Sequence, residues 1–434
     1  MRRYLLFIFV VFSSCHKFLD VQPTNAVSDD LTITDKASAE NAVRGSYRSL
    51  SATGYYGATF QFDALMSGAA LTYTQSSAGQ LQFLYHTLTA DNNDLKTVWA
   101  AIYKAINQAN HVITKVPGVK DAGLTDAYRN QLLGEGYFVR ALGYFDLART
   151  FGSVQLFLEP TTKVSDKLGK PRSTQAEVYA QVLNDLNAAE PLLPLTTVRD
   201  RATRKTVWGL RARVELYLHQ WAAAETDAGR LIADSVNYKL VTPYNGFFTK
   251  ANTTESVFEL SYSIGYPNPM FSNWKSGGNY APNDSIRKLL TDPAVGGGRS
   301  ALIGINGTKV LGVLYPQSNG TDPVYVIRIA ELWLIRAEAR AQQDNVAGAQ
   351  DDLNAVRARA GVSPVTLGTS GEALDAIEQE RRVEFALEPH RWFDLVRTGR
   401  ASAVLNVTDN RRYVFPIPAP ERQADPSLDQ NPGY

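Results

Sequence analysis

Two segments of this chain align with each other without a gap, and each reads as a pair of helices. They are RARVELYLHQWAAAETDAGRLIA at 211–233 and RAEARAQQDNVAGAQDDLNAVRA at 336–358. Each starts with Arg-Ala, continues as a helix, passes through a short polar turn and ends in a second, alanine-rich helix. Because small side chains let antiparallel helices approach closely, the repeat predicts helical hairpins packed side by side.

The first helix of the later copy is apolar on two sides, which predicts that it lies between two neighbouring helices. The two stripes are Leu332, Ile335 and Ala339, and Trp333, Ala337 and Ala341. This is the layout of tetratricopeptide helix pairs. The two copies are far apart in the sequence, so we do not expect a continuous solenoid.

Other segments also carry a helical pattern. A helix is expected over 36–50, capped near Thr34 or Asp35, and another over about 124–150. Between them, apolar residues recur at steps of three and four up to Pro117-Gly118: Trp99, Ile102, Ile106, Ala109, Ile113 and Val116. Only VFELSY at 257–262 reads as a short strand. The fold class is therefore mainly α.

Two regions lack this regularity, at 51–93 and 236–322. Both combine Gly, Ser, Asn and Gln with many aromatic residues, which predicts long loops. The proline-rich end at 413–434 cannot form a long helix, and we expect it to lie extended across the helical body.

The amino terminus resembles a lipoprotein signal. Arg2 and Arg3 precede the apolar segment 4–12, and Ser13-Ser14-Cys15 follows. The apolar segment is too short to span a bilayer, so residues 1–14 are expected to be a signal peptide. Cys15 would then be lipidated, followed by a tether over 15–35, and acyl chains would hold the protein on a membrane that it does not cross. The alternative is an ordinary signal peptide with an incidental cysteine.

Charge and composition exclude several classes of function. The net charge is +1, from 44 basic and 43 acidic residues, so no global field favours nucleic acid. The five histidines are scattered and there is a single cysteine, which predicts no metal site. Gly296-Gly297-Gly298 lacks a following Lys-Ser/Thr, so it is not a phosphate loop. No cofactor is expected.

The segment EQERRVEFALEPHRWFDLVRTGR at 378–400 is dense in acids, bases and large apolar residues, and we interpret it as a helical span. Glu380 and Glu384 stand one helical turn apart and could suggest a glycosidase pair. Arginines within helical reach would instead lower the pKa of these carboxyl groups, whereas a general acid needs a raised pKa. We therefore interpret the segment as an internally neutralised structural network, with no catalytic residue.

Several motifs together resemble the SusD/RagB family of outer-membrane lipoproteins, and the resemblance covers nearly the whole chain. Pro389 and Asp425-Pro426 depart from commoner residues only at structural turns. The motifs are CHKFLDVQP (15–23), VWAAIYKAINQANHVI (98–113), EGYFVRALGYFDLARTFGSVQL (135–156), TRKTVWGLRARVELYL (203–218), VIRIAELWLIRAEARAQ (326–342), the 378–400 segment and FPIPAPERQADPSLDQNPGY (415–434).

The resemblance implies a non-catalytic protein at the cell surface, anchored in the outer membrane through Cys15. It would bind glycans and deliver them to a SusC-like TonB-dependent transporter. It further implies one domain at 36–434, in which tetratricopeptide-like pairs form a scaffold over about 36–235 and 323–400. The loop-rich insert at about 236–322 would contribute to the ligand surface. A peptide-binding member of the family, a glycoside hydrolase and a protein-interaction scaffold remain the alternatives.

Candidate ligand contacts come from the aromatic residues of the two loop-rich regions. Flat aromatic side chains can stack on the C–H faces of sugar rings, while amides and carboxylates bind the hydroxyl groups. Trp274 is the leading candidate, because polar residues and glycines surround it and predict exposure. The candidates are Asp63, Tyr73, Gln80, Phe83, Tyr85, Asn273, Trp274, Asn279 and Tyr280. For each of them, packing within the protein is the competing interpretation.

Overall fold

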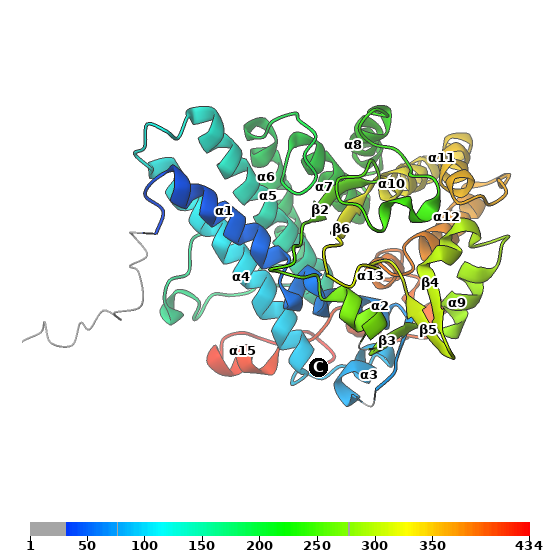
Figure 1. The fold of residues 1–434 in the computed structure, drawn as a ribbon. Helices are drawn as coiled ribbons and strands as arrows, with labels where there is room; N and C mark the ends of the chain where they lie inside the picture. The colour runs from blue at the N-terminus through cyan, green and yellow to red at the C-terminus, as the bar shows by residue number, and fades with distance from the viewer. Residues whose placement is uncertain (1–31, 76, 277) are drawn as a thin grey trace, which may run out of the picture.

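The computed structural model describes residues 32–75, 77–276 and 278–434 and is mainly helical (Figure 1). The predicted signal peptide, Cys15 and the tether up to residue 31 lie outside these residues. The helices are α1 (Lys36–Leu50), α2 (Thr59–Ser67), α3 (Ala78–Leu84), α4 (Asn93–Lys115), α5 (Asp126–Phe151), α6 (Gln175–Leu192), α7 (Arg204–Tyr217), α8 (Trp221–Ala233), α9 (Asp284–Thr291), α10 (Ile329–Gln342), α11 (Val346–Arg359), α12 (Ser370–Glu384), α13 (Arg391–Arg397), α14 (Ala401–Leu405) and α15 (Ala419–Ala424).

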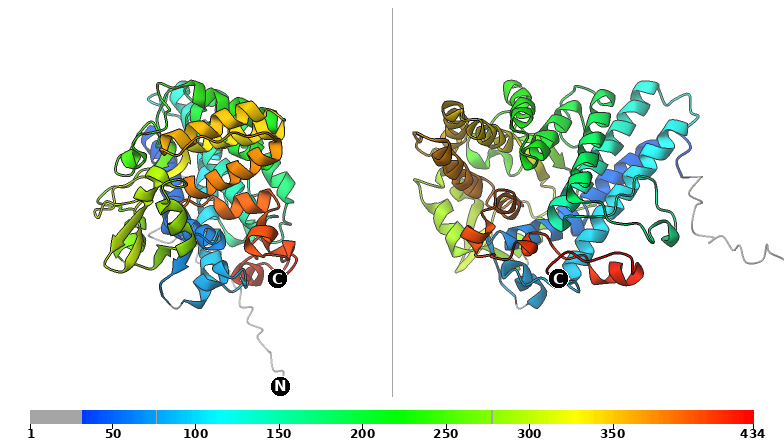
Figure 2. Two further views of the ribbon diagram at one scale, coloured as in Figure 1. Left: turned by 90° about the vertical axis from the view of Figure 1, so that its right-hand side faces the viewer. Right: turned by 180° about the vertical axis from the view of Figure 1, so that it is seen from behind.

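Successive helices pack as antiparallel pairs, which confirms the predicted scaffold. The two repeated segments form the hairpins α7–α8 and α10–α11. Although they are distant in the sequence, α8 packs directly against α10, so the two copies are neighbours in space. Figures 1 and 2 show these pairs continuing the row of helices that α1, α4, α5 and α6 begin.

The predicted helix boundaries follow local signals. Asp35 caps α1 by accepting a hydrogen bond from the backbone N–H of Ser38 at 2.8 Å, so the helix begins at the expected residue. The apolar stripe of α4 is buried from Trp99 to Ala109, whereas Ile113 is half-buried. Gly152 ends α5 with a φ of +73°, a conformation that glycine adopts without a steric penalty.

The strands form three small antiparallel pairs. β1 (Leu71–Tyr73) pairs with β3 (Tyr280–Pro282), and β4 (Ile303–Asn306) forms a hairpin with β5 (Lys309–Gly312). The predicted strand is β2 (Ser256–Leu260), which pairs with β6 (Val324–Arg328) under α7. Both β2 and β6 are fully buried, so they act as a link between the scaffold and the segment after α8.

Two predictions about local structure are wrong. The regions expected to be loops contain α2, α3 and α9, and every residue of α2 except Thr59 is buried. The 378–400 segment is not one helix: α12 ends at Glu384 and α13 starts at Arg391. Pro389 lies in the break, and proline would clash with the carbonyl four residues earlier in a continuous helix.

The carboxyl-terminal segment crosses the helical body, as expected, and we call residues 413–434 the strap. Its backbone forms hydrogen bonds with other parts of the chain. Phe415 N–H donates to Thr150 O, and Ala419 N–H donates to Ala90 O, both at 2.7 Å. The strap contains one short helix, α15. Within the described ranges, no helix combines the length and the apolar character needed to cross a membrane.

Candidate ligand-binding site

The β1–β3 pair brings the two aromatic regions of the sequence together. Tyr73 lies opposite Tyr280 in the ladder, and the backbone N–H of Thr74 donates to Asn279 O at 2.8 Å. Beside this pair, the amide of Gln75 donates to the side chain of Asn279 at 2.5 Å. Three of the candidates, Tyr73, Asn279 and Tyr280, therefore belong to one small structural unit.

An aromatic cluster underlies this unit. Tyr280 stacks face to face on Phe62, with 3.9 Å between ring centroids and 8° between planes. Phe62 also contacts Trp274 at 5.2 Å, and Tyr73 meets Tyr280 edge-on at 5.0 Å. Trp274 is fully buried and Tyr280 is 7% exposed, whereas Tyr73 is half-buried. Tyr73 is therefore the accessible member of the cluster.

A chain of polar groups continues from Tyr280 to the start of α4. The Tyr280 hydroxyl donates to Gln80 Oε1 at 2.9 Å, and the Gln80 amide donates to the Asp94 carboxylate. Burial raises the pKa of Asp94 above its usual value. Asn92 caps α4 by accepting from the backbone N–H of Asp94 at 2.9 Å, which fixes the position of this acid.

An open hollow of about 510 Å³ lies between Tyr73 and the start of α4, and we call it the Tyr73 hollow. Most of the side chains that line it carry an amide or a carboxylate, and Tyr73 is the aromatic residue in the lining. This combination can stack on one face of a sugar and bind its hydroxyl groups. The lining residues are Tyr73, Ser77, Gly79, Gln80, Gln82, Asp91, Asn92, Asn93 and Asp94.

Most of the residues that line the Tyr73 hollow were not predicted from the sequence. Residues 89–94 read TADNND, a polar run directly before a strong amphipathic helix. Such a run usually marks the start of a helix. It does not indicate that Asp91 and Asp94 line a hollow. Asn93 is exposed at the edge of the hollow, and no hydrogen bond occupies its side chain among the described residues.

Trp274 was expected to be exposed, and this expectation is wrong. Its indole is buried against Phe62 and against Gly312 of β5, where an added Cβ would lie only 2.8 Å from the indole Cδ2. The residues that enclose the ring, Phe62 and Gly312, come from distant parts of the sequence. The local sequence around Trp274 therefore did not indicate whether its side chain is accessible.

The remaining candidates are divided between the core and the surface. Phe83 is fully buried and meets Phe415 of the strap at 5.5 Å. Asn273 is half-buried and donates to the Pro269 carbonyl at 3.0 Å. Tyr85, at the end of α3, is 64% exposed but does not line the hollow.

Asp63 of α2 is a buried acid of unusual character. It is 2% exposed, and neither carboxyl oxygen has a hydrogen-bond partner among the described residues. Burial, followed by the charge of Asp94, raises its pKa well above the usual value. In the part of the chain that the structure describes, no three His, Cys, Asp or Glu side chains gather closely enough to hold a metal ion.

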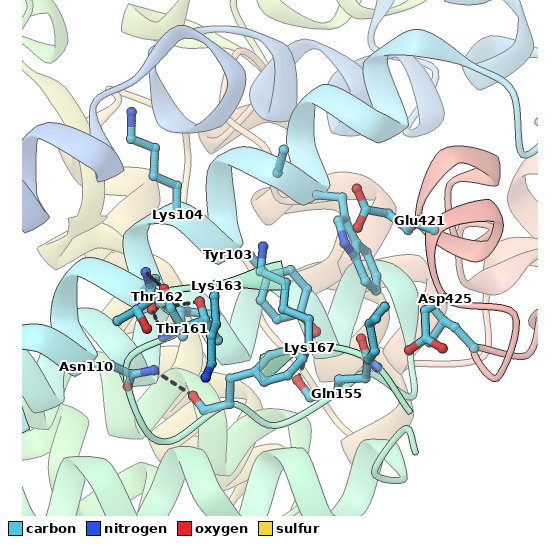
Figure 3. A pocket seen from close by; sticks show the side chains of 18 residues that line it. Tyr103, Lys104, Asn110, Gln155, Thr161, Thr162, Lys163, Lys167, Glu421 and Asp425 are labelled. Carbon is cyan, nitrogen blue, oxygen red and sulfur yellow. Dashed lines mark hydrogen bonds between the residues drawn. The ribbon is translucent and has the colours of Figure 1, made fainter. Parts of the chain in front are cut away.

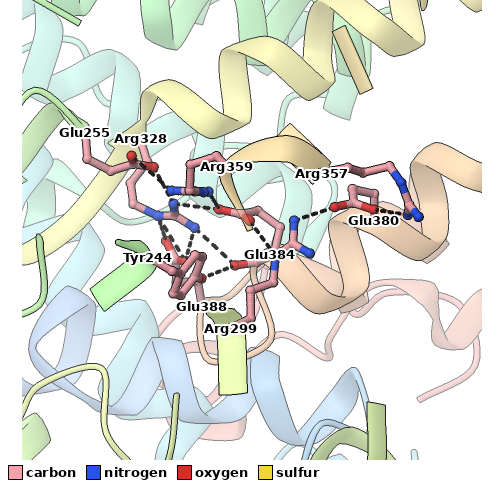
Figure 4. A network of polar contacts seen from close by, with 9 residues as sticks. All are labelled: Tyr244, Glu255, Arg299, Arg328, Arg357, Arg359, Glu380, Glu384 and Glu388. Carbon is pink, nitrogen blue, oxygen red and sulfur yellow. Dashed lines mark hydrogen bonds and ion pairs between the residues drawn. The ribbon is translucent and has the colours of Figure 1, made fainter. Parts of the chain in front are cut away.

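Three acids of the charge-rich 378–400 segment, Glu380, Glu384 and Glu388, lie in a buried network (Figure 4). Glu384 accepts from Arg299 and Arg328 at 2.8 and 2.9 Å and also pairs with Arg359. Burial alone would raise its pKa, but the three guanidinium groups outweigh it and lower the pKa to about 2. Glu380, 2% exposed, pairs with Arg299 and Arg357. These acids are therefore neutralised by structural partners.

Two family models match the chain. Residues 312–409 match the model of the SusD family, and residues 17–216 match a model described as starch-binding associating with outer membrane. A SusD-like protein of Bacteroides ovatus is 26% identical over 73% of this chain and 67% of its own length. Another, from Formosa agariphila, is 25% identical over 98% of this chain and 96% of its own.

Solved structures share the fold. A SusD superfamily protein of Bacteroides thetaiotaomicron superposes with a TM-score of 0.79 at 24% identity, covering 91% of this chain and 99% of the other. A laminarin-binding SusD-like protein also superposes with a TM-score of 0.79, at 23% identity, covering 92% of this chain and the whole of the other. The arrangement of helix pairs is thus common to these proteins.

Proposed function

We propose that this chain, which matches the SusD family model over residues 312–409 and a model described as starch-binding associating with outer membrane over residues 17–216, is a non-catalytic glycan receptor of the outer membrane. The Tyr73 hollow is the observation on which we base the position of the proposed glycan-binding site. It offers one accessible aromatic ring beside exposed amide and carboxylate groups. In this assignment Tyr73 stacks on a sugar ring, and Asn93 and Asp91 bind its hydroxyl groups.

A binding role fits the acids better than hydrolysis does. Glu380 and Glu384 are buried and paired with arginine, so a polysaccharide cannot reach them. Burial raises the pKa of Asp63 well above its usual value, but Asp63 is enclosed by the core around α2 and does not line the Tyr73 hollow. A glycosidase needs two carboxyl groups on either side of an accessible bond.

Binding is tested by calorimetry against a panel of glycans that includes laminarin, the ligand named for one structural neighbour. Tyr73→Ala should weaken binding of a verified glycan by at least tenfold without lowering the melting temperature by more than ~2 °C. Tyr128→Ala, a half-buried tyrosine at the start of α5, is the matched control. Equal affinity of Tyr73→Ala and the wild type would remove the hollow as the site.

Turnover is tested on the same panel. Incubation with each polysaccharide should release no reducing ends. Any hydrolysis that persists in the purified protein would overturn the non-catalytic assignment and favour a glycoside hydrolase.

The proposal includes a lipid anchor and a protein partner. Cys15 would carry the lipid at the start of the mature chain, and the receptor would pass its ligand to a SusC-like TonB-dependent transporter. Labelled palmitate should enter the wild type but not Cys15→Ser, and protease added to intact cells should degrade the anchored protein. Purification from outer membranes should recover a transporter of this class; recovery of the receptor alone after crosslinking would count against the partner.

A further inference from the structure

A second pocket, of about 580 Å³, lies between α4, the segment after α5 and the strap helix α15 (Figure 3). We call it the strap pocket. Figures 1 and 2 show α15 on one side of the amino-terminal end of α4 and α3 on the other, so the strap pocket and the Tyr73 hollow are separate. None of the residues that line one of them lines the other.

The inner wall of the strap pocket is aromatic. Tyr103 of α4 meets Phe157 edge-on at 5.8 Å and contacts Trp99 at 4.9 Å. Leu168 lines the pocket from the loop side and is 48% exposed. A volume of this size holds a molecule of roughly drug size, and apolar walls favour an apolar body.

The amide groups of the pocket are already used within the protein. Asn110 donates to the carbonyls of Phe157 and Glu159 at 2.8 and 3.0 Å. Asn107 exchanges hydrogen bonds with the backbone of Thr161, donating at 3.1 Å and accepting at 2.7 Å. The Gln155 amide donates to Lys170 O at 2.6 Å. The amide groups of the strap pocket are therefore not available to a ligand.

The free polar groups of the strap pocket are charged. Lys163 and Lys167 are exposed on the loop and form no ion pair among the described residues. The nearby Asp166 carboxylate is held by the backbone N–H groups of Thr162 and Lys163, at 2.8 and 3.0 Å. On the opposite wall, Glu421 of α15 is half-buried, while Asp425 accepts from Gly169 N–H at 3.0 Å. Figure 3 shows Lys163 across the cavity from Glu421 and Asp425.

We propose that the strap pocket binds a small organic anion. Its apolar body would lie against Tyr103 and Phe157, and its carboxylate or sulfonate would face Lys163 and Lys167. This goes beyond glycan binding, because it assigns a different ligand class to a different place on the molecule. Glu421 determines the orientation of the ligand. Its negative charge, on the wall opposite the lysines, repels an anionic group that faces α15.

The test uses two fluorescent probes of similar shape, anilinonaphthalene sulfonate and the uncharged phenylnaphthylamine, titrated into the chain carrying Cys15→Ser so that no lipid competes. The sulfonate should bind one saturable site. The double variant Lys163→Gln, Lys167→Gln should weaken the sulfonate about three- to tenfold and leave the neutral probe unchanged. Glu421→Gln should strengthen the sulfonate about twofold. Ala100→Trp, at an exposed lining position of α4, should weaken both probes.

Lys239→Gln, Lys250→Gln is the control, because both lysines are exposed and neither lines the pocket. The proposal is overturned if the sulfonate shows no saturable binding, or if the Lys163 and Lys167 variant binds it as the wild type does. It is also overturned if a glycan that binds at the Tyr73 hollow displaces the sulfonate. Loss of glycan binding in Tyr73→Ala with the sulfonate still bound would support two independent sites.

Discussion

Arg328, the last residue of β6, donates a hydrogen bond from Nη1 to Oε1 of Glu384, the last residue of α12, at 2.9 Å. Both side chains are buried, with at most 1% of their surface exposed. The same guanidinium pairs with Glu255 at 2.7 Å and with Glu388 at 2.6 Å. A buried cation with three acidic partners joins the strand pair β2–β6 to the carboxyl-terminal helices. The network is therefore a structural link between segments that are far apart in the sequence.

Glu384→Gln should destabilise the protein by about 3–5 kcal/mol, because it leaves the guanidinium groups of Arg299, Arg328 and Arg359 without their shared carboxylate. Urea unfolding followed by circular dichroism gives the free energy of unfolding. Asp375→Asn, an exposed acid on the same helix, should change it by less than ~0.5 kcal/mol. A folded Glu384→Gln protein that lost only glycan affinity would contradict the structural role.

The contribution of Glu384 should depend on pH in the acid range. Its pKa in the folded state is about 2, below the ordinary value of 4.5 for a glutamate, so the native state favours the ionised form. Its stabilisation is therefore fully present above pH ~4.5 and is lost as the pH falls towards 2. The difference in unfolding free energy between wild type and Glu384→Gln should shrink over this window. A difference that stays constant from pH 5 to pH ~2.5 would show that the carboxylate charge is not what stabilises the fold.

Asp63 should behave in the opposite way. Burial raises its folded-state pKa well above 3.8, so its stabilising contribution is greatest below that value and decreases as the pH rises towards the folded-state pKa. Asp63→Asn, which cannot ionise, should raise the free energy of unfolding at pH 7 by about 1–2 kcal/mol and by less at pH 4. Unfolding curves at the two pH values measure this. A loss of stability at pH 7 would mean that the ionised carboxylate has a stabilising partner.

The helix pairs could be predicted because their signals are local. The cap at Asp35, the apolar stripe of α4 and the alanine-rich repeats each specify a helix within one or two turns of chain. The break before α13 could have been found from Pro389, which is incompatible with the interior of a helix. The sequence predicted that the acids of the 378–400 segment pair with arginines. It did not identify Glu255, Arg299 and Arg328 as members of this network, because they lie outside the segment.

The sequence predicted the regions of the chain that form the candidate site, but not which of their residues line it. Tyr73 and Tyr280 are opposite each other because β1 and β3 pair across more than two hundred residues, which no local pattern encodes. Helix α2 was missed because it is buried on all sides and has almost no amphipathic period. The burial of Trp274 has the same origin, since Gly312 and Phe62 reach it from distant segments.

Trp274→Ala should act mainly on stability. Removing an indole with no exposed surface leaves a cavity beside Phe62 and Gly312, which should cost about 3–5 kcal/mol. Gly312→Ala should also destabilise, because its methyl group would overlap the indole ring. Thermal unfolding and glycan calorimetry should be measured on the same samples. Full stability combined with lost binding in Trp274→Ala would return this residue to the set of ligand contacts.

Asn431 should hold the strap in place. Its amide, 4% exposed, donates to the carbonyls of Phe151 and Phe415, both at 2.8 Å, and its Oδ1 accepts from Arg172 at 2.5 Å. Asn431→Ala removes the donor to the buried carbonyls of Phe151 and Phe415 and should cost about 2–3 kcal/mol, whereas Arg172 keeps its bonds to Asp429 and Ser153. Limited proteolysis should then cut the strap at least tenfold faster. Asp429→Asn should change little, because the Asp429 side chain is 74% exposed. Since α15 forms one wall of the strap pocket, Asn431→Ala should also weaken the binding of anilinonaphthalene sulfonate. If cleavage rates were equal in Asn431→Ala and the wild type, the strap would be held mainly by its apolar contacts, such as Phe415 against Phe83.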